Sequence, residues 1–207
     1  MTSFKQYRLA LQVFQSARLR RDYADLALIP QYTPVGDFFF DEMYGPRDFS
    51  DRNSEARRIQ HLLHVLPGVR IRDLEEVLEL LDLTNQLDDQ LARMLQLDAV
   101  GLDFDEPTYE RYYRQADNYE ARLLQLNLVR SCTYTVFRIS RSQLLGMALH
   151  RSGLFARLVG IEAAHDFLVK GYDALCGVSD VTRFAETVHI REFDRLNRIF
   201  EVSSDES

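Results

Sequence analysis

Two pairs of side chains in this sequence have the spacing of metal ligands. In each, a glutamate is followed three positions later by a histidine: Glu162 with His165, and Glu186 with His189. On a helix this spacing puts the carboxylate and the imidazole on one face. Two such pairs, together with a glutamate from each of two other helices, build the di-iron site of ferritin-like bundles. The pattern therefore suggests an oxidase.

The apolar pattern of the two helices makes this metal site the weaker hypothesis. His165 lies centrally in the apolar stripe of its helix with Glu162 at the edge, whereas Glu186 points away from the stripe of the last helix. We therefore favour a hydrogen-bonded core histidine at position 165 and expect no cofactor. The metal site stays as the alternative, with the ligand set Glu42, Glu162, His165, Glu186 and His189, and with Glu120 as a further candidate.

Glu42 is the other residue with chemical potential, because it falls inside an apolar helical stripe. At 100° per residue, Phe38, Phe39 and Met43 share one face, and Glu42 lies in the middle of it. A carboxylate among aromatic rings must find a cation, accept several hydrogen bonds or stay protonated. We expect a buried ion pair with an arginine of a neighbouring helix, and a ligand-binding or catalytic role is the alternative. The candidates for this ion pair or ligand site are Glu42, Arg47, Phe38, Phe39 and His165.

Residues 38–44, with the sequence FFFDEMY, resemble the signature of the FFLEELY motif proteins, an uncharacterised bacterial family. Phe40, Asp41 and Met43 stand where the motif has leucine, glutamate and leucine, which are changes of similar size or charge. Residues 45–49 and 166–172 are similar to the same family. The resemblance implies a bacterial source and an α-helical fold over most of the chain, and it implies no activity.

The composition indicates an ordinary globular protein. The chain has 207 residues, of which 46% are hydrophobic, and its formal net charge is −7. This charge argues against a nucleic-acid partner. No apolar run is long enough to span a bilayer, and the first residues have no signal-peptide core. Cys132 and Cys176 fit neither a redox pair nor a metal knuckle. We expect a soluble, cytoplasmic protein without a transmembrane segment.

The charges are unevenly distributed along the chain. Residues 73–106 contain eleven acidic residues and one arginine, whereas residues 121–161 contain six arginines and no acidic residue. The two segments are expected to be neighbours whose fields compensate. A basic surface that binds an anionic partner is the alternative.

Apolar side chains recur with helical spacing almost throughout, which predicts an all-α fold. We expect one single-domain bundle of about seven or eight helices over residues 1–202, followed by a disordered tail at 203–207. Thr33 is the expected N-cap of the second helix, and the β-branched residues 133–136 are expected to bend or end the fifth. The expected helices span residues 3–27, 34–44, 50–67, 72–97, 108–129, 142–150, 154–176 and 180–202.

One segment contains both a ridge of small side chains and several large apolar ones. Small residues recur every four positions from Ala148 to Ala164, and Arg151 and Arg157 flank this ridge. Small residues let a second helix approach closely. We favour packing inside the bundle. A homodimer contact and association with an anionic membrane surface are the alternatives.

These observations favour a non-enzymatic binding or protein-interaction module. The warrant is the absence of an assembled catalytic pattern: the sequence has no Walker A motif and no glycine-rich dinucleotide fingerprint. The expected partner is another protein or a small ligand, and a homodimer is possible. The alternative is a helical-bundle enzyme that depends on a metal or cofactor and uses Glu42, Glu162 and His165.

Overall fold

The computed structural model describes residues 2–43 and 71–202, and all regular elements in these ranges are helices. The expected all-α bundle is therefore confirmed. The expected helix over residues 50–67 and the tail at 203–207 lie outside the described residues. The elements are α1 (Phe4–Asp22), α2 (Ala24–Ala27), α3 (Thr33–Asp37), η1 (Phe38–Met43), α5 (Ile71–Leu97), α6 (Glu106–Gln115), α7 (Tyr119–Ser140), α8 (Gln143–Arg151), α9 (Gly153–Leu158), α10 (Glu162–Cys176) and α11 (Thr182–Phe200).

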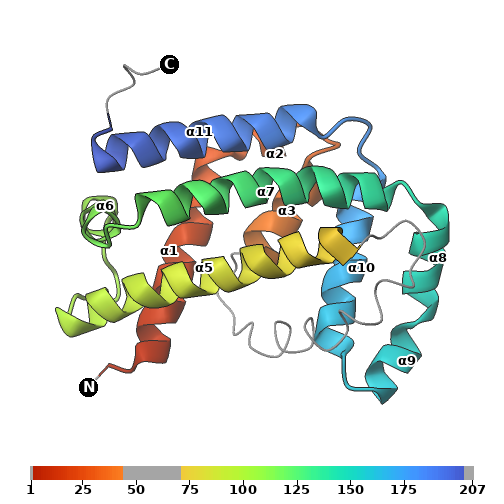
Figure 1. Ribbon diagram of the computed structural model, residues 1–207, viewed down its shortest axis with the longest axis horizontal. Helices are drawn as coiled ribbons and strands as arrows, with labels where there is room; N and C mark the ends of the chain where they lie inside the picture. The colour runs from red at the N-terminus through yellow and green to blue at the C-terminus, as the bar shows by residue number, and fades with distance from the viewer. Residues whose placement is uncertain (1, 44–70, 203–207) are drawn as a thin grey trace.

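Helix α7 is the centre of the bundle. It packs antiparallel to α5 on one side and to α11 on the other, while α1 crosses these helices at one end and α10 crosses at the other (Figure 1). Helices α8 and α9 form a corner beside α10 (Figure 1). None of the described helices is long and apolar enough to cross a membrane.

The first predicted helix is divided in the structure. Ser3 begins α1 with a capping box, in which its side chain accepts from the Gln6 amide and the Gln6 side chain accepts from the Ser3 amide. The helix ends at Tyr23, and α2 follows at once. Tyr23 is buried, so the change of direction brings its phenol into the bundle.

The segment that contains Glu42 is not a plain α-helix. Thr33 is not the N-cap as predicted, because α3 begins one residue earlier and the Thr33 hydroxyl donates to the Ala27 carbonyl at 2.7 Å. After α3 the backbone continues as a wider π-helical turn, η1. Phe38, Phe39 and Phe40 are all buried there. The Ser16 hydroxyl of α1 donates to the Phe40 carbonyl at 3.1 Å and so ties this turn to α1.

Two other predicted helices are divided at residues with positive φ. The expected helix over residues 108–129 is split into α6 and α7 beside Asp117, whose φ is 47°. Helix α7 continues through residues 133–136, where the Thr133 hydroxyl donates to the Val129 carbonyl instead of ending the helix. The expected helix over residues 154–176 is split into α9 and α10 at Gly160, whose φ is 69°. The long predicted helix over residues 72–97 is confirmed as α5.

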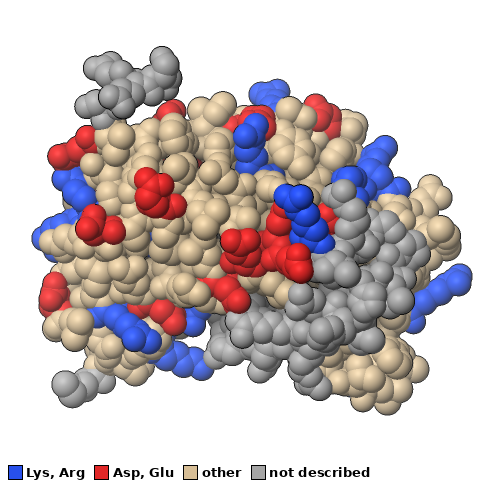
Figure 2. Space-filling model, viewed as in Figure 1, with Lys and Arg blue, Asp and Glu red and all other residues tan. Residues whose placement is uncertain are grey.

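Helices α5 and α7 lie side by side, as the charge pattern predicted. Arg138 of α7 pairs with Asp73 of α5 at 2.5 Å, although Arg130 pairs with Glu186 of α11. Acidic side chains still gather in the middle of the face shown in Figure 2. The charge compensation between the two segments is therefore partial.

The apolar core consists of two clusters. One surrounds Tyr7, Leu11 and Leu91, where α1, α5 and α6 meet, and the other surrounds the three phenylalanines of η1. A group of buried polar side chains is distributed over the same helices: Gln12, Gln15, Ser16 and Arg18 on α1, Asp88 on α5, and Arg122 and Gln125 on α7.

Candidate functional site

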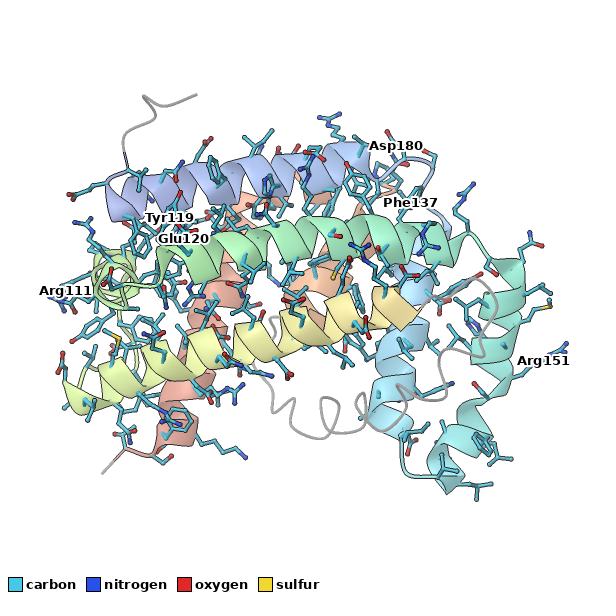
Figure 3. All side chains as sticks on the ribbon, viewed as in Figure 1. Arg111, Tyr119, Glu120, Phe137, Arg151 and Asp180 are labelled. Atoms are coloured by element: carbon cyan, nitrogen blue, oxygen red, sulfur yellow. The ribbon has the colours of Figure 1, made fainter. Side chains whose placement is uncertain are left out.

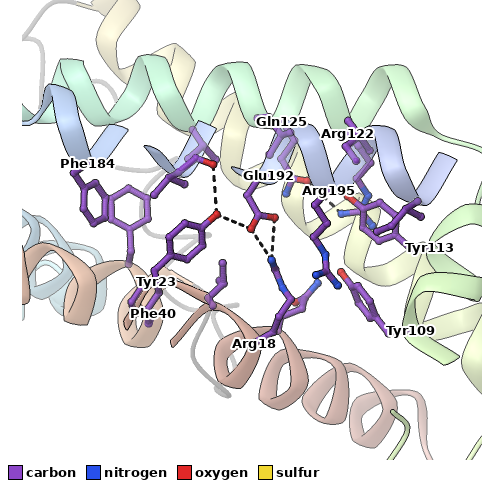
Figure 4. A pocket seen from close by; sticks show the side chains of 18 residues that line it. Arg18, Tyr23, Phe40, Tyr109, Tyr113, Arg122, Gln125, Phe184, Glu192 and Arg195 are labelled. Atoms are coloured by element: carbon purple, nitrogen blue, oxygen red, sulfur yellow. Dashed lines mark hydrogen bonds and ion pairs between the residues drawn. The ribbon is translucent and has the colours of Figure 1, made fainter. Parts of the chain in front are cut away.

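A cavity of about 70 Å³ lies among α1, η1, α6, α7 and α11 (Figure 4). Aromatic rings form much of its wall, with Tyr109 and Tyr113 of α6 at one end and Phe40 and Phe184 at the other. Polar groups that line it come from α1, α7 and α11. Enclosed, mostly apolar spaces with a few convergent polar groups are the usual form of small-ligand sites.

One wall of the cavity is a buried ion pair between the first and last described helices. The Arg18 guanidinium of α1 donates to both oxygens of Glu192 on α11, at 2.5 and 3.0 Å, and the Tyr23 hydroxyl donates to the same carboxylate at 2.8 Å (Figure 4). Burial works against the charge of Arg18, but Glu192 outweighs it and raises the Arg18 pKa above its ordinary value. Burial and the Glu192 carboxylate raise the pKa of Tyr23. The charges of Arg18 and Glu192 therefore cancel, and this wall has no net charge.

Arg122 on α7 is the cavity residue without such a partner. Its side chain is buried, with 3% of the residue exposed. The guanidinium donates to the Gln125 side chain at 3.2 Å and to the Leu87 carbonyl at 3.4 Å, and it lies 4.3 Å from the centre of the Tyr113 ring. Its Nε has no hydrogen-bond partner, and within the described ranges Arg122 forms no ion pair with a carboxylate.

Asp88 of α5 is an acidic residue that interacts electrostatically with Arg122. Asp88 is buried and accepts a hydrogen bond from the Gln15 side chain at 3.1 Å. Burial raises the pKa of Asp88, while Arg122 acts in the opposite direction without reversing the shift. The carboxyl group therefore holds its proton more readily than an exposed aspartate, which weakens it as a counter-ion for Arg122.

Arg195 on α11 completes the set of charges around the cavity. It lies 2.9 Å from Glu106 and 3.0 Å from Glu110, both on α6. Of the four charged residues that line the cavity, Arg18 and Glu192 compensate each other and Arg195 is matched by α6. Arg122 is therefore the charged residue of the cavity lining whose positive charge is not compensated by an ion pair in the described ranges.

The structure places Phe38, Phe39 and Glu42 on η1 in contact with α10 and α11, whereas His165 binds the Leu149 carbonyl of α8. The Glu42 side chain is partly buried and accepts a hydrogen bond from Lys170 of α10 at 2.9 Å, and its pairing with an arginine stays a prediction. Phe38 is buried against Phe167 of α10, with ring centres 5.1 Å apart, and Phe39 packs on Phe184. Arg47 lies outside the described residues. The two motif segments, 38–44 and 166–172, are therefore in contact through their described parts.

The structure does not assemble the alternative metal site. Glu162 pairs with Arg157 at 2.8 Å. Glu186 accepts from Arg130 at 2.8 Å and from the Tyr134 hydroxyl at 2.6 Å. Within residues 2–43 and 71–202, no three histidine, cysteine, aspartate or glutamate side chains are placed to hold one ion.

The prediction of a core histidine at position 165 is confirmed. His165 is buried, and its Nε2 lies 2.9 Å from the Leu149 carbonyl, which requires a proton on that nitrogen. The Ser152 hydroxyl is 3.1 Å away from the same nitrogen. His189 instead stacks on Phe193. The two histidines of the predicted pairs therefore have separate surroundings.

Sequence reasoning missed the polar residues of the cavity, although a signal for them exists. Gln15 and Arg18 continue the buried stripe that Tyr7 and Leu11 begin on α1. On α7, Arg122 and Gln125 are buried positions as well. A polar residue on a core-facing stripe, which drew attention to Glu42, would have identified this site as well.

Comparison with known proteins gives a family without a function. A family model described as Domain of unknown function (DUF8198) matches residues 1–206. No curated protein matches the chain, and no solved structure matches it. The resemblance to the FFLEELY motif proteins and the bacterial source stay predictions.

Proposed function

We propose that this chain, which belongs to the DUF8198 family, is a non-enzymatic binding module whose internal cavity takes up a small oxyanion such as a short-chain carboxylate. The observation that carries the proposal is Arg122, a buried cation at the cavity without an ion-pair partner in the described ranges. A buried charge lowers the free energy of unfolding unless it is paired. A bound anion supplies that pair.

The chemistry of the cavity fits a planar anion. An arginine guanidinium presents its N–H groups in a fork that matches a carboxylate, and the Nε of Arg122 is free to donate. The rings of Tyr109 and Tyr113 offer an apolar surface to the rest of the ligand. Gln15 adds an unpartnered side-chain oxygen, Oε1, that accepts from a hydroxyl or a protonated group.

The size of the cavity limits the ligand. A cavity of about 150 Å³ holds benzene, and a single water needs roughly 10–15 Å³. The present cavity of about 70 Å³ therefore suits an anion of a few heavy atoms, such as formate, acetate or nitrate. Larger metabolites, nucleotides and haem do not fit without rearrangement.

Thermal unfolding in a series of sodium salts tests the proposal. A ligand that binds only the folded state raises its stability by RT ln(1 + [L]/Kd), about 2.7 kcal/mol at one hundred times Kd. We expect the melting temperature to rise with the concentration of formate, acetate or nitrate, compared with chloride at the same ionic strength. The Arg122→Met variant is expected to lose this rise and to unfold at the same or a higher temperature without ligand, because the uncompensated charge is gone.

Two further variants make the result specific. Arg183→Met, which removes an exposed arginine of α11, is expected to keep the full response. Val188→Phe, which adds bulk at the cavity wall and keeps Arg122, is expected to lose the response. The proposal is wrong if no anion of the series stabilises the wild-type chain more than chloride does, or if Arg122→Met responds as the wild type does. If no anion stabilises the wild type, the cavity holds water instead of an anion.

A further inference from the structure

Helices α8 and α9 expose large apolar side chains at one corner of the molecule. Leu154, Phe155 and Leu158 of α9 are 72, 58 and 77% exposed, and Leu144 and Met147 of α8 are exposed as well. The predicted packing of this segment inside the bundle is therefore wrong for these side chains, although Leu145 and Leu149 of α8 are buried as predicted. Contiguous apolar surface of this kind on a folded protein usually marks an interaction site.

Two small residues of the same segment face the other way. Ala156 and Ala164 are buried, and His165 of α10 binds the Leu149 carbonyl, so α8 and α9 are held on α10 through their inner side. Gly146 is needed there because a Cβ at that position would lie 2.3 Å from the Tyr172 hydroxyl oxygen. The orientation of the two helices is therefore fixed with the large apolar residues directed outward.

Positive charge accompanies these apolar residues. Residues 141–161 contain Arg141, Arg151 and Arg157 and no acidic residue, in a chain whose net charge is −7. Arg151 extends away from the bundle (Figure 3). Arg157 pairs with Glu162 of α10, so part of its charge is compensated.

His150 adds positive charge to the corner when its imidazole is protonated. Its Nδ1 lies 2.8 Å from the Gly146 carbonyl, and its Nε2 lies 3.3 Å from Asp173. The Gly146 carbonyl, followed by Asp173, raises the pKa of His150 above its ordinary value. A shallow depression of about 460 Å³ lies here, and its lining includes Met147, His150, Arg151 and Tyr172.

We propose that the α8–α9 corner docks on the surface of a membrane that contains anionic phospholipids. Leu154, Phe155 and Leu158 enter the boundary between headgroups and acyl chains, and Arg151 lies at the level of the phosphates beside the depression. Apolar residues flanked by arginines are the composition of segments that lie in this interface. Long arginine side chains reach the phosphates while their stems stay in the apolar layer.

Charge complementarity favours a lipid surface over a second copy of the chain. A symmetric dimer through this corner gathers Arg151 and Arg157 of both copies at one interface, and like charges repel. An anionic bilayer presents the opposite charge over a wide area, so each arginine contributes to attraction. This inference is independent of the cavity around Arg122.

Flotation with lipid vesicles tests the proposal. We expect the wild-type chain to float with phosphatidylcholine vesicles that contain phosphatidylglycerol, and to float far less with phosphatidylcholine alone or at about 0.5 M salt. Arg151→Gln is expected to weaken binding roughly fivefold, the effect of one arginine near an anionic surface. The double variant Leu154→Ser with Leu158→Ser is expected to abolish it.

Matched controls come from other exposed positions. Leu28 and Leu97 are each 83% exposed and lie away from this corner, so the double variant Leu28→Ser with Leu97→Ser is expected to float like the wild type. Arg72→Gln removes an exposed arginine of α5 and serves as the charge control. The proposal is overturned if anionic vesicles do not retain the wild type, if the Leu154 and Leu158 variant floats unchanged, or if that variant alters only a concentration-dependent dimer.

Discussion

Arg18 and Glu192, which are 174 positions apart, form a two-pronged ion pair that fastens α1 to α11, with distances of 2.5 and 3.0 Å. The pair is almost fully shielded from water on the arginine side, and the Tyr23 hydroxyl adds a third donor. It closes one wall of the cavity with no net charge.

We expect the Glu192→Ala variant to lower the free energy of unfolding by about 3–5 kcal/mol, because it leaves the Arg18 charge buried without a partner. Replacing both partners, as Arg18→Met with Glu192→Leu, is expected to recover most of this loss. Chemical denaturation of the wild type, Arg18→Met, Glu192→Leu and the double variant measures the coupling energy. Additive effects of the two substitutions would contradict a direct interaction.

A methyl group at Gly146 is expected to displace the Tyr172 ring. The added Cβ would lie 2.3 Å from the Tyr172 hydroxyl oxygen, and the ring must leave its hydrogen bond to the Ser142 carbonyl. Gly146→Ala is therefore expected to lower the free energy of unfolding by about 1–3 kcal/mol, the usual cost of overpacking, although alanine favours a helix. Gly177→Ala is the control, because no atom lies within 4 Å of a Cβ there. An equal effect of both substitutions on the melting temperature would refute this reading.

The two cysteines are expected to differ sharply in reactivity. Cys132 is buried in α7, and burial raises the pKa of its thiol to about 12, so almost no thiolate forms at pH 8. Cys176 is exposed at the end of α10. A thiol reagent is expected to label Cys176 of the folded protein rapidly and to label Cys132 only in denaturant. Peptide mapping that found Cys132 labelled as fast as Cys176 would contradict the structure.

Asp88 is expected to make the stability of the protein depend on pH. Its pKa is raised in the folded state, so the folded protein binds this proton more strongly than the unfolded chain. The stabilisation that results from this difference in proton binding is fully present below the pKa of Asp88 in the unfolded chain, near 3.9. It is lost as the pH rises through the pKa of Asp88 in the folded protein. Asp88→Asn is therefore expected to gain stability relative to the wild type as the pH rises above about 4.

Denaturation at several pH values checks this expectation, with Glu120→Gln on the exposed part of α7 as the control. A constant difference between Asp88→Asn and the wild type across this range would show that the carboxyl does not titrate as described. If Arg122 binds the anion, Asp88→Asn is also expected to tighten binding, because it removes a competing negative charge.

The sequence by itself determined the fold class and the long helices. The apolar pattern of α5 and α11 repeats at helical spacing over many turns, and such a pattern allows only one type of element. It also identified the motif around Glu42 and the core position of His165. These are local properties, since they follow from which side chains share one face of one helix.

The tertiary structure decided where those helices break and which charges meet. The breaks at Asp117 and Gly160 depend on a single residue adopting positive φ, which costs little and leaves little trace in periodicity. The pairing of Arg18 with Glu192, and the absence of such a partner for Arg122 in the described ranges, depend on how α1, α7 and α11 pack. The sequence pattern does not tell a buried arginine with a paired carboxylate, such as Arg18, from one without it, such as Arg122. Only the packing of the helices distinguishes the two, because it decides which charged side chains meet.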